Sequence, residues 1–378
     1  MTKKFSVLFV ADTTSHDDCS AVQRFRVLKA GLEKLGARTG LIFLGDYPIG
    51  SPRILLAANT PLFLETVRQY DFVHAAGLSL IAMGLAKPFA NFKIVCDIHG
   101  STDEYRMNRK SYFDIPHSYQ MLASEMAWRV AKRKADCFTT VSEPLRQKML
   151  GEGIKEEKTK LIYNGVDTNV FKPCPTKQND VFTVTYAGAY QKWQGVENLV
   201  EAAKMLENEN VKFKLMGFQQ HDSGLKEAIK AKLGKNAQLM DYQPRVANQQ
   251  PNSFIQELCQ SDVLAIPRYF DLATPLYCNP EYVRKAFGWL PTKFAEYIAM
   301  GKPVIVTKLD EASKFVEKYD CGFICDPDPK SFAGAILEAK NASPEELDRK
   351  GMNGRRLAEE EFDVQVIGKR YFDFLSKL

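Results

Sequence analysis

The sequence predicts an α/β protein built from two doubly wound, Rossmann-like domains in tandem. Three observations support this fold class. Short apolar runs recur along the chain with little internal alternation, as expected for strands buried on both faces of a parallel sheet. Amphipathic stretches of helical period separate these runs. A segment rich in proline and polar residues, 171–180 (FKPCPTKQND), divides the pattern into two halves and is the expected linker.

The first half begins with two lysines and an apolar run that is too short for a signal peptide, so it is predicted to be a strand. Helical patterns follow the strands, for example at Ala21–Leu35 and Tyr119–Lys134. The predicted strands are Ser6–Val10, Gly40–Leu44, Phe72–Ala75, Lys93–Asp97, Cys137–Val141 and Lys160–Tyr163.

The second half repeats this alternation without a visible sequence repeat. We expect one domain over residues 1–172, a second over 173–360, and a closing helix over 361–378. Asp326-Pro327-Asp328 follows a strand and precedes a helical pattern, which predicts a turn and an N-cap rather than a metal site. The predicted strands are Thr183–Ala187, Lys212–Met216, Ala237–Met240, Val263–Pro267, Pro303–Thr307 and Gly322–Cys325.

Composition sets limits on function. Lysine and arginine number 51 against 46 acidic residues, a net charge of +5, which is too mild for a nucleic-acid-binding arm. The bias is compatible with anionic small ligands or an acidic membrane surface. The eight cysteines are scattered without a CxxC or a cysteine-histidine cluster, which predicts reduced, packed thiols in a cytoplasmic protein. No run reaches the length of a membrane-spanning helix.

Several catalytic motifs are absent. The first predicted strand ends in ADTTSHDDCS without any glycine, so the dinucleotide fingerprint GxGxxG is missing where it belongs. No GxxxxGK[ST], GxSxG or HExxH occurs in the chain. These absences argue against a nicotinamide-dependent enzyme, a P-loop kinase, an α/β-hydrolase and a zincin.

The stretch 290–305 (LPTKFAEYIAMGKPVI) predicts a helix that begins at an N-cap, Thr292, and ends at Gly301, followed by a buried strand. Lys293 and Glu296 share one face of this helix. Two interpretations are open. The pair is either a surface ion pair or part of an anion site, because a helix N-terminus offers free N–H groups and partial positive charge.

Three further segments lie at predicted strand ends: 96–106 (CDIHGSTDEYR), 161–173 (LIYNGVDTNVFKP) and 185–206 (TYAGAYQKWQGVENLVEAAKML). NGVD followed by FxP, then strand–G–six residues–G–helix, then PxKxxEYxAxGKPVI, occur in this order with these separations. Over nearly the whole chain this resembles the retaining family-4 glycosyltransferases of the GT-B architecture, the glycosyl transferases group 1.

The resemblance implies two Rossmann-like domains that face each other across a cleft and hinge at the linker. The first domain would take the acceptor, the second would bind a nucleoside diphosphate sugar, and the closing helix would pack back on the first domain. Catalytic roles are implied for His99, Lys192 and Lys293. Donor-binding roles are implied for Gly188, Gln194, Gly217, Leu290, Pro291, Thr292 and Glu296, with the carboxylate of Glu296 on the ribose hydroxyls.

The chain departs from the family pattern at several positions. Position 288, eight before Glu296, is Gly288 where the family has a glutamate on the donor sugar, and Glu281 is the nearest acidic residue upstream. In the glycine loop, Ala189 and Gln194 replace the usual arginine and lysine. Lys192 is the candidate to supply the missing charge. These differences leave the identity of the donor sugar open.

Histidines and basic residues leave further alternatives. The resemblance places His99 against the donor sugar, whereas His74, His117 and His221 are interpreted as structural. Between residues 101 and 135, seven Lys/Arg stand against four Asp/Glu. A solvated helix face is the default interpretation of this basic patch, and docking on anionic lipid at the inner face of the membrane is the alternative.

The expected function is therefore retaining transfer of a sugar from a nucleoside diphosphate sugar to an acceptor hydroxyl, in glycan or glycolipid synthesis. No metal or other cofactor is expected, because Lys192, Lys293 and the helix end would stabilise the leaving diphosphate. No convincing pair of carboxylates is present, which favours a same-face displacement. The alternatives are a nucleotide-sugar 2-epimerase and a non-catalytic nucleotide-sugar-binding subunit.

Overall fold

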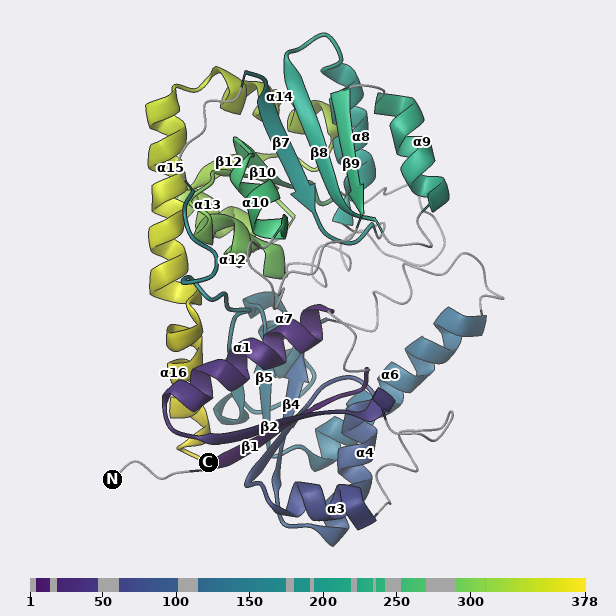
Figure 1. Cartoon of the computed structure of the whole chain (residues 1–378). Coiled ribbons are helices and arrows are strands. Elements are labelled where there is room, and N and C mark those ends of the chain that lie inside the picture. Colours follow the sequence, from purple (N-terminus) through teal and green to yellow (C-terminus); the bar gives the residue numbers. More distant parts are fainter. Residues whose placement is uncertain are drawn as a thin grey trace. The chain divides into compact units, whose positions relative to one another are not determined.

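The structure is a computed structural model (Figure 1), and its described residues form two compact units. The first unit comprises the chain up to Gly165 together with Val364–Leu378, and the second comprises Val166–Ala273 and Leu290–Asp363. The structure describes residues 5–13, 19–46, 61–100, 115–174, 180–190, 194–218, 223–233, 236–241, 253–269, 290–309 and 311–378.

The first unit contains a six-stranded sheet in which every neighbouring pair is parallel. Its order is β2-β1-β3-β4-β5-β6, so the direction of strand addition reverses beside β1. In such sheets ligands bind at the carboxyl ends of the strands that flank the reversal. The strands are β1 (Ser6–Ala11), β2 (Arg38–Phe43), β3 (Phe72–Ala75), β4 (Lys93–Ile98), β5 (Cys137–Thr140) and β6 (Thr159–Leu161).

Helices cover both faces of this sheet, and β1 shows why its sequence is apolar without alternation. Val7 and Phe9 pack under α1 (Ser20–Lys34) and α16 (Val364–Leu375). Leu8 and Val10 point to the opposite face. That face is covered by α3 (Pro61–Arg68), α4 (Ser79–Ala86), α6 (Ile115–Lys134) and α7 (Glu143–Gly151), and the short helices η1 (Leu44–Asp46), η2 (Lys87–Phe89) and η3 (Glu156–Lys158) complete the unit.

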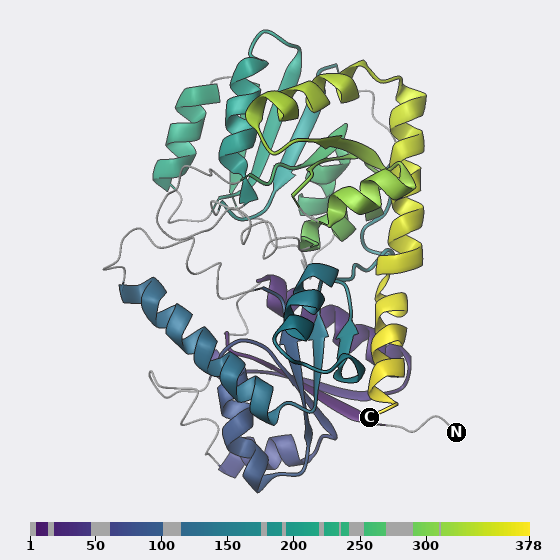
Figure 2. The ribbon, with the colours of Figure 1, turned by 180° about the vertical axis from the view of Figure 1, so that it is seen from behind.

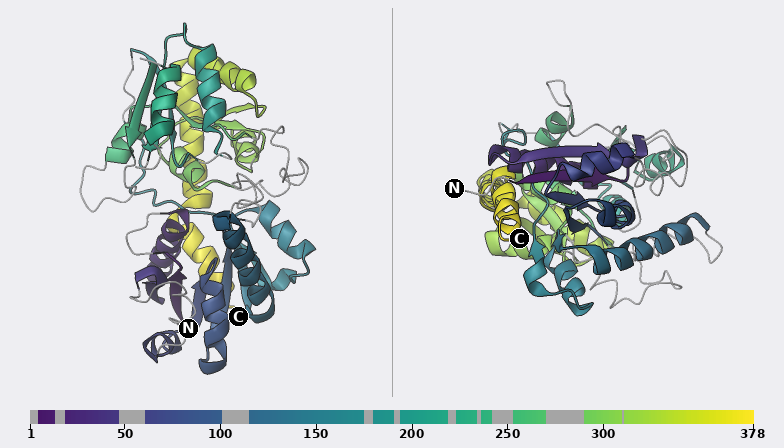
Figure 3. Two further views of the ribbon diagram at one scale, coloured as in Figure 1. Left: turned by 90° about the vertical axis from the view of Figure 1, so that its right-hand side faces the viewer. Right: turned by 90° about the horizontal axis from the view of Figure 1, so that it is seen from below.

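The last helix, α16, lies directly against α1, as the left panel of Figure 3 shows. Gly31 on α1 and Gly368 on α16 face each other so closely that a Cβ on either would meet the backbone of the other at about 2.5–2.6 Å. Two glycines therefore allow the two backbones to touch. Tyr371 from α16 is fully buried in the same layer.

The second unit contains another fully parallel sheet, ordered β12-β11-β10-β7-β8-β9. The strand order reverses between β7 and β10, which places the expected ligand edge at their carboxyl ends. The strands are β7 (Phe182–Ala187), β8 (Val211–Phe218), β9 (Ala237–Asp241), β10 (Val263–Ile266), β11 (Val304–Thr307) and β12 (Gly322–Cys325).

Figure 2 shows this second sheet from behind, between two layers of helices. One layer packs Leu199, Ile229 and Phe332 into a common apolar cluster on the sheet. Its helices are α8 (Val196–Met205), α9 (Ser223–Leu233) and α14 (Pro329–Asn341). The remaining helices are α10 (Ser253–Cys259), α12 (Thr292–Ala299), α13 (Ala312–Tyr319) and α15 (Pro344–Leu357), with a π-helical turn η7 (Ala358–Phe362).

All predicted strands are present within two residues of their expected limits. The two-domain α/β fold is thereby confirmed. Asp328 is the N-cap of α14 and its carboxylate accepts a hydrogen bond from the backbone N–H of Ser331, as predicted. Two helix limits were wrong. Pro291, not Thr292, is the N-cap of α12, and the closing helix begins at Val364 because the π-helical turn before it ends at extended Asp363.

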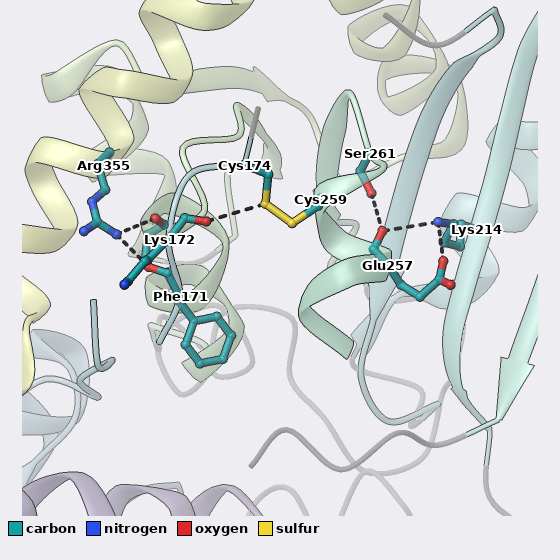
Figure 4. The surroundings of a disulfide bond; sticks show 9 residues. Phe171, Lys172, Cys174, Lys214, Glu257, Cys259, Ser261 and Arg355 are labelled. Atoms are coloured by element: carbon teal, nitrogen blue, oxygen red, sulfur yellow. Dashed lines mark hydrogen bonds and ion pairs between the residues drawn. A yellow bond between two sulfur atoms is a disulfide. The ribbon is translucent and has the colours of Figure 1, made fainter. Parts of the chain in front are cut away.

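The prediction that all cysteines are reduced is also wrong. Cys174, at the start of the expected linker, forms a disulfide with Cys259 at the end of α10 (Figure 4). The guanidinium of Arg355 donates hydrogen bonds to the carbonyls of Thr168 (3.0 Å) and Phe171 (2.6 Å) in the same segment. The spacing of cysteines in sequence gave no sign of this bond, because 85 positions separate the two residues.

The described part of the chain contains no helix long and apolar enough to cross a membrane. Within the same residues, no group of three or more histidine, cysteine, aspartate or glutamate side chains is placed to hold a metal ion.

Candidate active site

The carboxyl end of β7 is fixed to α12 by a buried tyrosine. The Tyr297 hydroxyl accepts a hydrogen bond from the backbone N–H of Ala187 at 2.8 Å and donates to its carbonyl oxygen at 3.1 Å. Because Ala187 is the last residue of β7, this pair of bonds brings the start of α12 beside the loop that follows the strand. That loop opens with Gly188.

Lys293 lies under this loop. Its ammonium is 4.0 Å from the centre of the Tyr186 ring and donates a hydrogen bond to Gln194 Oε1 at 3.2 Å. Only 5% of Lys293 is exposed. A Cβ at Gly188, whose φ is +154°, would approach Lys293 Nζ to 2.5 Å. The glycine therefore leaves room for the ammonium group directly beside the backbone.

Two more glycines keep backbone segments close at this edge of the sheet. Gly217, the next-to-last residue of β8, has φ +114°, and a Cβ there would meet the Gly188 carbonyl oxygen at 2.5 Å. Gly195, at φ +72°, is the N-cap of α8, and a Cβ there would meet the Pro267 carbonyl oxygen at 2.0 Å. Both conformations favour glycine over other residues.

The start of α12 contributes the other predicted donor residues. Pro291 is the N-cap, with φ −67° and ψ 141°, and no side chain caps the helix. A helix start of this kind presents N–H groups and partial positive charge to an anion. Leu290 is buried and Thr292 is half-buried. Glu296, one turn further on, is 5% exposed.

The structure thus brings Gly188, Gln194, Gly217 and Lys293 together from sequence positions far apart. It does not favour the surface-ion-pair interpretation of Lys293 and Glu296, since both side chains are nearly buried. Tyr186 and Tyr297 were missed, although both occur within quoted motifs. Lys192, Glu281 and Gly288 lie outside the described residues, so their expected roles stay predictions.

In the first unit, His99 follows β4 at the carboxyl edge of the sheet. Its Nε2 is hydrogen-bonded to the carboxylate of Asp97, which is fully buried, while 21% of the His99 side chain is exposed. Asp97 also receives two hydrogen bonds from Arg24. Asp97 and Arg24 were not predicted as site residues, although a carboxylate inside an apolar run is a signal of a paired charge.

Asp12 lies at the same edge, one residue after β1. Its Oδ2 accepts the backbone N–H of Leu78 at 3.0 Å, in a turn where Gly77 has φ +57°. Burial raises the pKa of Asp12, and the hydrogen bond from Leu78 opposes this only in part. The ends of β1 and β3, which flank the reversal of strand order, are thus joined through a carboxyl group.

Two family models match the chain. Glycosyltransferase Family 4 matches residues 5–170, and Glycosyl transferases group 1 matches residues 168–357. A comparison with curated proteins found no match.

Solved structures share the fold at low sequence identity. A glycosyltransferase from Rickettsia africae has a TM-score of 0.72 at 17% identity, covering 99% of this chain and 98% of that one. Sucrose-phosphate synthase from Thermosynechococcus elongatus has a TM-score of 0.72 at 18% identity, covering 99% of both chains. HepE from Anabaena in complex with UDP-glucose has a TM-score of 0.70 at 20% identity, covering 99% and 100%.

Proposed function

Because this chain belongs to the glycosyl transferases group 1 and is therefore a glycosyltransferase, we propose that it uses a nucleoside diphosphate sugar and transfers the sugar with retention. The second unit is proposed to bind the donor and the first to take the acceptor. An acceptor hydroxyl on a glycan or glycolipid fits the mild positive charge of the chain.

The observation that carries the donor assignment is the group formed by Gly188, Lys293 and the start of α12. A nearly buried ammonium group, glycine backbone and a helix start without a side-chain cap together suit an anion with several oxygens. Glu296 follows one turn later, where a carboxylate can accept hydrogen bonds from two vicinal hydroxyls. This arrangement matches a diphosphate followed by a ribose.

In the proposed reaction, the bond between the anomeric carbon and the diphosphate breaks while the acceptor oxygen bonds to the same face of that carbon. Lys293, the start of α12 and Lys192 stabilise the charge that develops on the leaving diphosphate. A diphosphate oxygen takes the proton of the acceptor hydroxyl. No resident metal or cofactor has a part in this proposal, so transfer is expected to continue in the presence of a metal chelator.

The first test is a thermal-shift screen of the full chain against nucleoside diphosphates and their sugars. UDP and UDP-glucose come first, since HepE has been solved with both. A ligand present at about 100 times its Kd should stabilise the protein by roughly 2.7 kcal/mol. Stabilisation by nucleoside diphosphates but not by the nucleosides supports the diphosphate site, and the absence of any shift contradicts it.

The second test measures turnover. Donor consumption that depends on an added acceptor, with the product linkage in the anomeric configuration of the donor by NMR, supports retaining transfer. An inverted linkage contradicts retention. Conversion of the donor sugar without acceptor indicates the epimerase, and tight binding without turnover on any acceptor indicates the binding subunit.

The basic patch on α6 supports membrane contact as part of this proposal. Leu122 and Met126 are 54% and 49% exposed, and Arg129 and Arg133 continue the same helical face at intervals of three and four residues. Figure 2 shows the amino-terminal part of α6 extending beyond the other elements of its unit. Exposed apolar and cationic side chains on one face suit anionic lipid at the inner face of a membrane.

Co-sedimentation with vesicles tests this contact. Replacement of Arg129 and Arg133 by glutamine should reduce binding to vesicles rich in anionic lipid at least several-fold. Lys230→Gln with Lys232→Gln, on exposed positions of α9, is the matched control and should bind as the wild type does. Equal binding to neutral and anionic vesicles would contradict the electrostatic part of the proposal.

A further inference from the structure

The carboxylate of Asp97 is the centre of a buried polar cluster in the first unit. Asp97 follows the apolar residues Ile94–Cys96 near the end of β4, and its side chain is fully buried. Residues of α1, β3, β5 and the loop after β4 surround it. The groups around it are Arg24 Nε (2.8 Å from Oδ2), Arg24 Nη2 (3.1 Å from Oδ1), Thr139 Oγ1 (2.6 Å from Oδ1), His74 Nε2 (3.0 Å from Oδ2) and His99 Nε2.

Arg24 keeps this carboxylate ionised. Its guanidinium forms two hydrogen bonds with the two oxygens, and its remaining nitrogen donates to the Tyr163 carbonyl at 3.0 Å. Burial alone raises the pKa of Asp97, but the positive charge of Arg24 together with the two histidines outweighs burial and holds the pKa well below its usual range. The carboxylate can therefore only accept hydrogen bonds.

The geometry determines which nitrogen of His99 carries a proton. Because the carboxylate accepts, Nε2 of His99 must donate, and the neutral ring then has a lone pair at Nδ1. The ring of Phe25 packs against His99 edge to face, with centroids 5.8 Å apart. Arg24 and Phe25 are adjacent on α1, so one helix fixes both the charge and the ring plane.

His74 is a second histidine beside the same carboxylate. Its Nδ1 is 2.6 Å from the Tyr371 hydroxyl, and its Nε2 is 3.0 Å from the ionised carboxylate of Asp97. The neutral ring therefore carries its proton at Nε2, and Nδ1 accepts from the hydroxyl. Burial lowers the pKa of His74, which keeps the ring neutral with its proton at Nε2 facing Asp97. Tyr371 belongs to α16, so the closing helix takes part in the cluster.

We propose that Asp97 is a positioning residue for the transfer reaction: it holds His99 with Nε2–H directed inward and Nδ1 presented to the substrate. This inference rests on the proposed function only for its consequence in catalysis. With Nδ1 as an acceptor, His99 can receive a hydrogen bond from a sugar hydroxyl. A ring free to change tautomer would present a donor at Nδ1 for part of the time and lose that bond.

The first experiment needs no substrate. Two-bond proton–nitrogen correlation spectra of the full chain, labelled at histidine and recorded at about pH 8.5, distinguish the two tautomers. His99→Gln identifies the His99 signals. We expect a single species protonated at Nε2, whose proton exchanges slowly with water. A ring protonated at Nδ1 alone, or one that exchanges between tautomers, overturns the proposal.

The second experiment is a double-mutant cycle on transfer kinetics. Asp97→Asn and His99→Gln should each lower kcat at least tenfold and change the donor KM less than threefold. The double variant should be no more than about twofold slower than the slower single variant, because both changes remove one function. Effects that multiply instead would show that Asp97 does not act through His99.

Asp71→Asn is the matched control, since Asp71 immediately precedes β3 in the same sheet and accepts hydrogen bonds from Ser6. It should stay within twofold of the wild-type rate. If Asp97→Asn does not fold, the spectrum of the wild-type protein still shows which nitrogen of His99 carries the proton. If the wild type transfers no sugar from any donor, the proposed function fails, while the spectrum continues to test Asp97 and His99.

Discussion

At the scale of single residues, the proposed donor site consists of side chains that are nearly buried around glycine backbone. Lys293 and Glu296 come from one helix, α12, but the Tyr186 ring under the ammonium of Lys293 comes from β7. The predicted roles of these residues can be separated by changes that keep their size. The first prediction below concerns binding of the diphosphate, and the second concerns binding of the ribose.

Gly188→Ala should weaken nucleoside diphosphate binding by about 1–2 kcal/mol, because a Cβ placed 2.5 Å from Lys293 Nζ must displace the ammonium group. Isothermal titration with the nucleotide found in the thermal-shift screen measures this loss. Gly224→Ala, where a Cβ would meet nothing within 4 Å, is the control and should bind normally. Normal binding by Gly188→Ala would contradict the proposed contact between Lys293 and the diphosphate.

Glu296→Gln should weaken nucleotide-sugar binding by roughly 1–3 kcal/mol, as expected for the loss of a charge-assisted hydrogen bond, without unfolding the protein. Titration with the nucleotide sugar and with its deoxyribose analogue measures the effect. The deoxyribose analogue should lose less affinity than the ribose form. Glu317→Gln, an exposed glutamate on α13, is the matched control. Equal binding by Glu296→Gln and wild type would disprove the ribose assignment.

At the scale of elements, two contacts between segments far apart in the sequence were not predictable from the sequence pattern. One is the disulfide that joins Cys174 to α10 (Figure 4), beside the hydrogen bonds of Arg355 to Phe171 and Thr168. The other is the contact between Gly31 and Gly368, which seats α16 on α1. Each is expected to contribute measurably to the stability of its unit.

Reduction of the disulfide should lower the free energy of unfolding of the second unit by about 2–4 kcal/mol, because 85 residues separate the cysteines and the unfolded chain regains that loop's freedom. Urea unfolding with and without dithiothreitol measures the difference. The double variant Cys174→Ser, Cys259→Ser should be insensitive to the reductant. A titration that finds every thiol free in the untreated protein would contradict the bond itself.

Gly368→Ala should destabilise the first unit by roughly 1–3 kcal/mol, since the added methyl group meets the Gly31 backbone and neither helix can give way locally. Urea unfolding followed by circular dichroism measures the change. Gly334→Ala, inside α14 with open space around it, should instead stabilise the protein by about 0.5–1 kcal/mol. Similar effects of both changes would show that α16 is not seated through this contact.

At the scale of the whole molecule, the charge buried in the first unit makes stability depend on pH. Burial lowers the pKa of His74, so the unfolded state binds protons more readily, and stability falls below about pH 6.5 by up to about 1.4 kcal/mol per pH unit. Asp97 has a lowered pKa in the folded state, so its contribution is present above about pH 4 and is lost as the pH falls further.

At alkaline pH, the free energy of unfolding falls because groups lose protons more readily in the unfolded state than in the folded state. Burial raises the pKa of Cys96 and Cys137, so the unfolded state ionises first above about pH 8.5 and the folded state loses stability. We therefore expect the free energy of unfolding to be greatest between about pH 7 and pH 8. Urea unfolding at about pH 5.5, 7.5 and 9.5, that is, one unit outside each limit and between the limits, measures the curve. His74→Gln should flatten its acid side, and an unchanged acid slope would contradict the assignment.

The sequence by itself determined the fold class and singled out most residues of the proposed donor site. Strand limits were predictable because burial on both faces produces uninterrupted apolar runs, and helix limits because period, glycine and proline act locally. Lys293 and Glu296 could be singled out because a helix N-terminus attracts anions wherever it lies. The predicted N-cap of α12 was wrong by one residue, because the local sequence allows either Pro291 or Thr292 in that position.

Only the tertiary structure decided which distant groups meet. Arg24, His74, Asp97 and Tyr371 carry no shared pattern in the sequence. Burial of the charges of Arg24 and Asp97 is tolerable because the two groups pair with each other, and the Tyr371 hydroxyl is hydrogen-bonded to His74 Nδ1. The bond between Cys174 and Cys259 likewise depends on packing across 85 residues rather than on spacing. Local sequence patterns determine where strands and helices form, because they depend on residues that are adjacent in the chain. Hydrogen bonds, ion pairs and the disulfide between distant residues depend instead on how the sheet and helices pack.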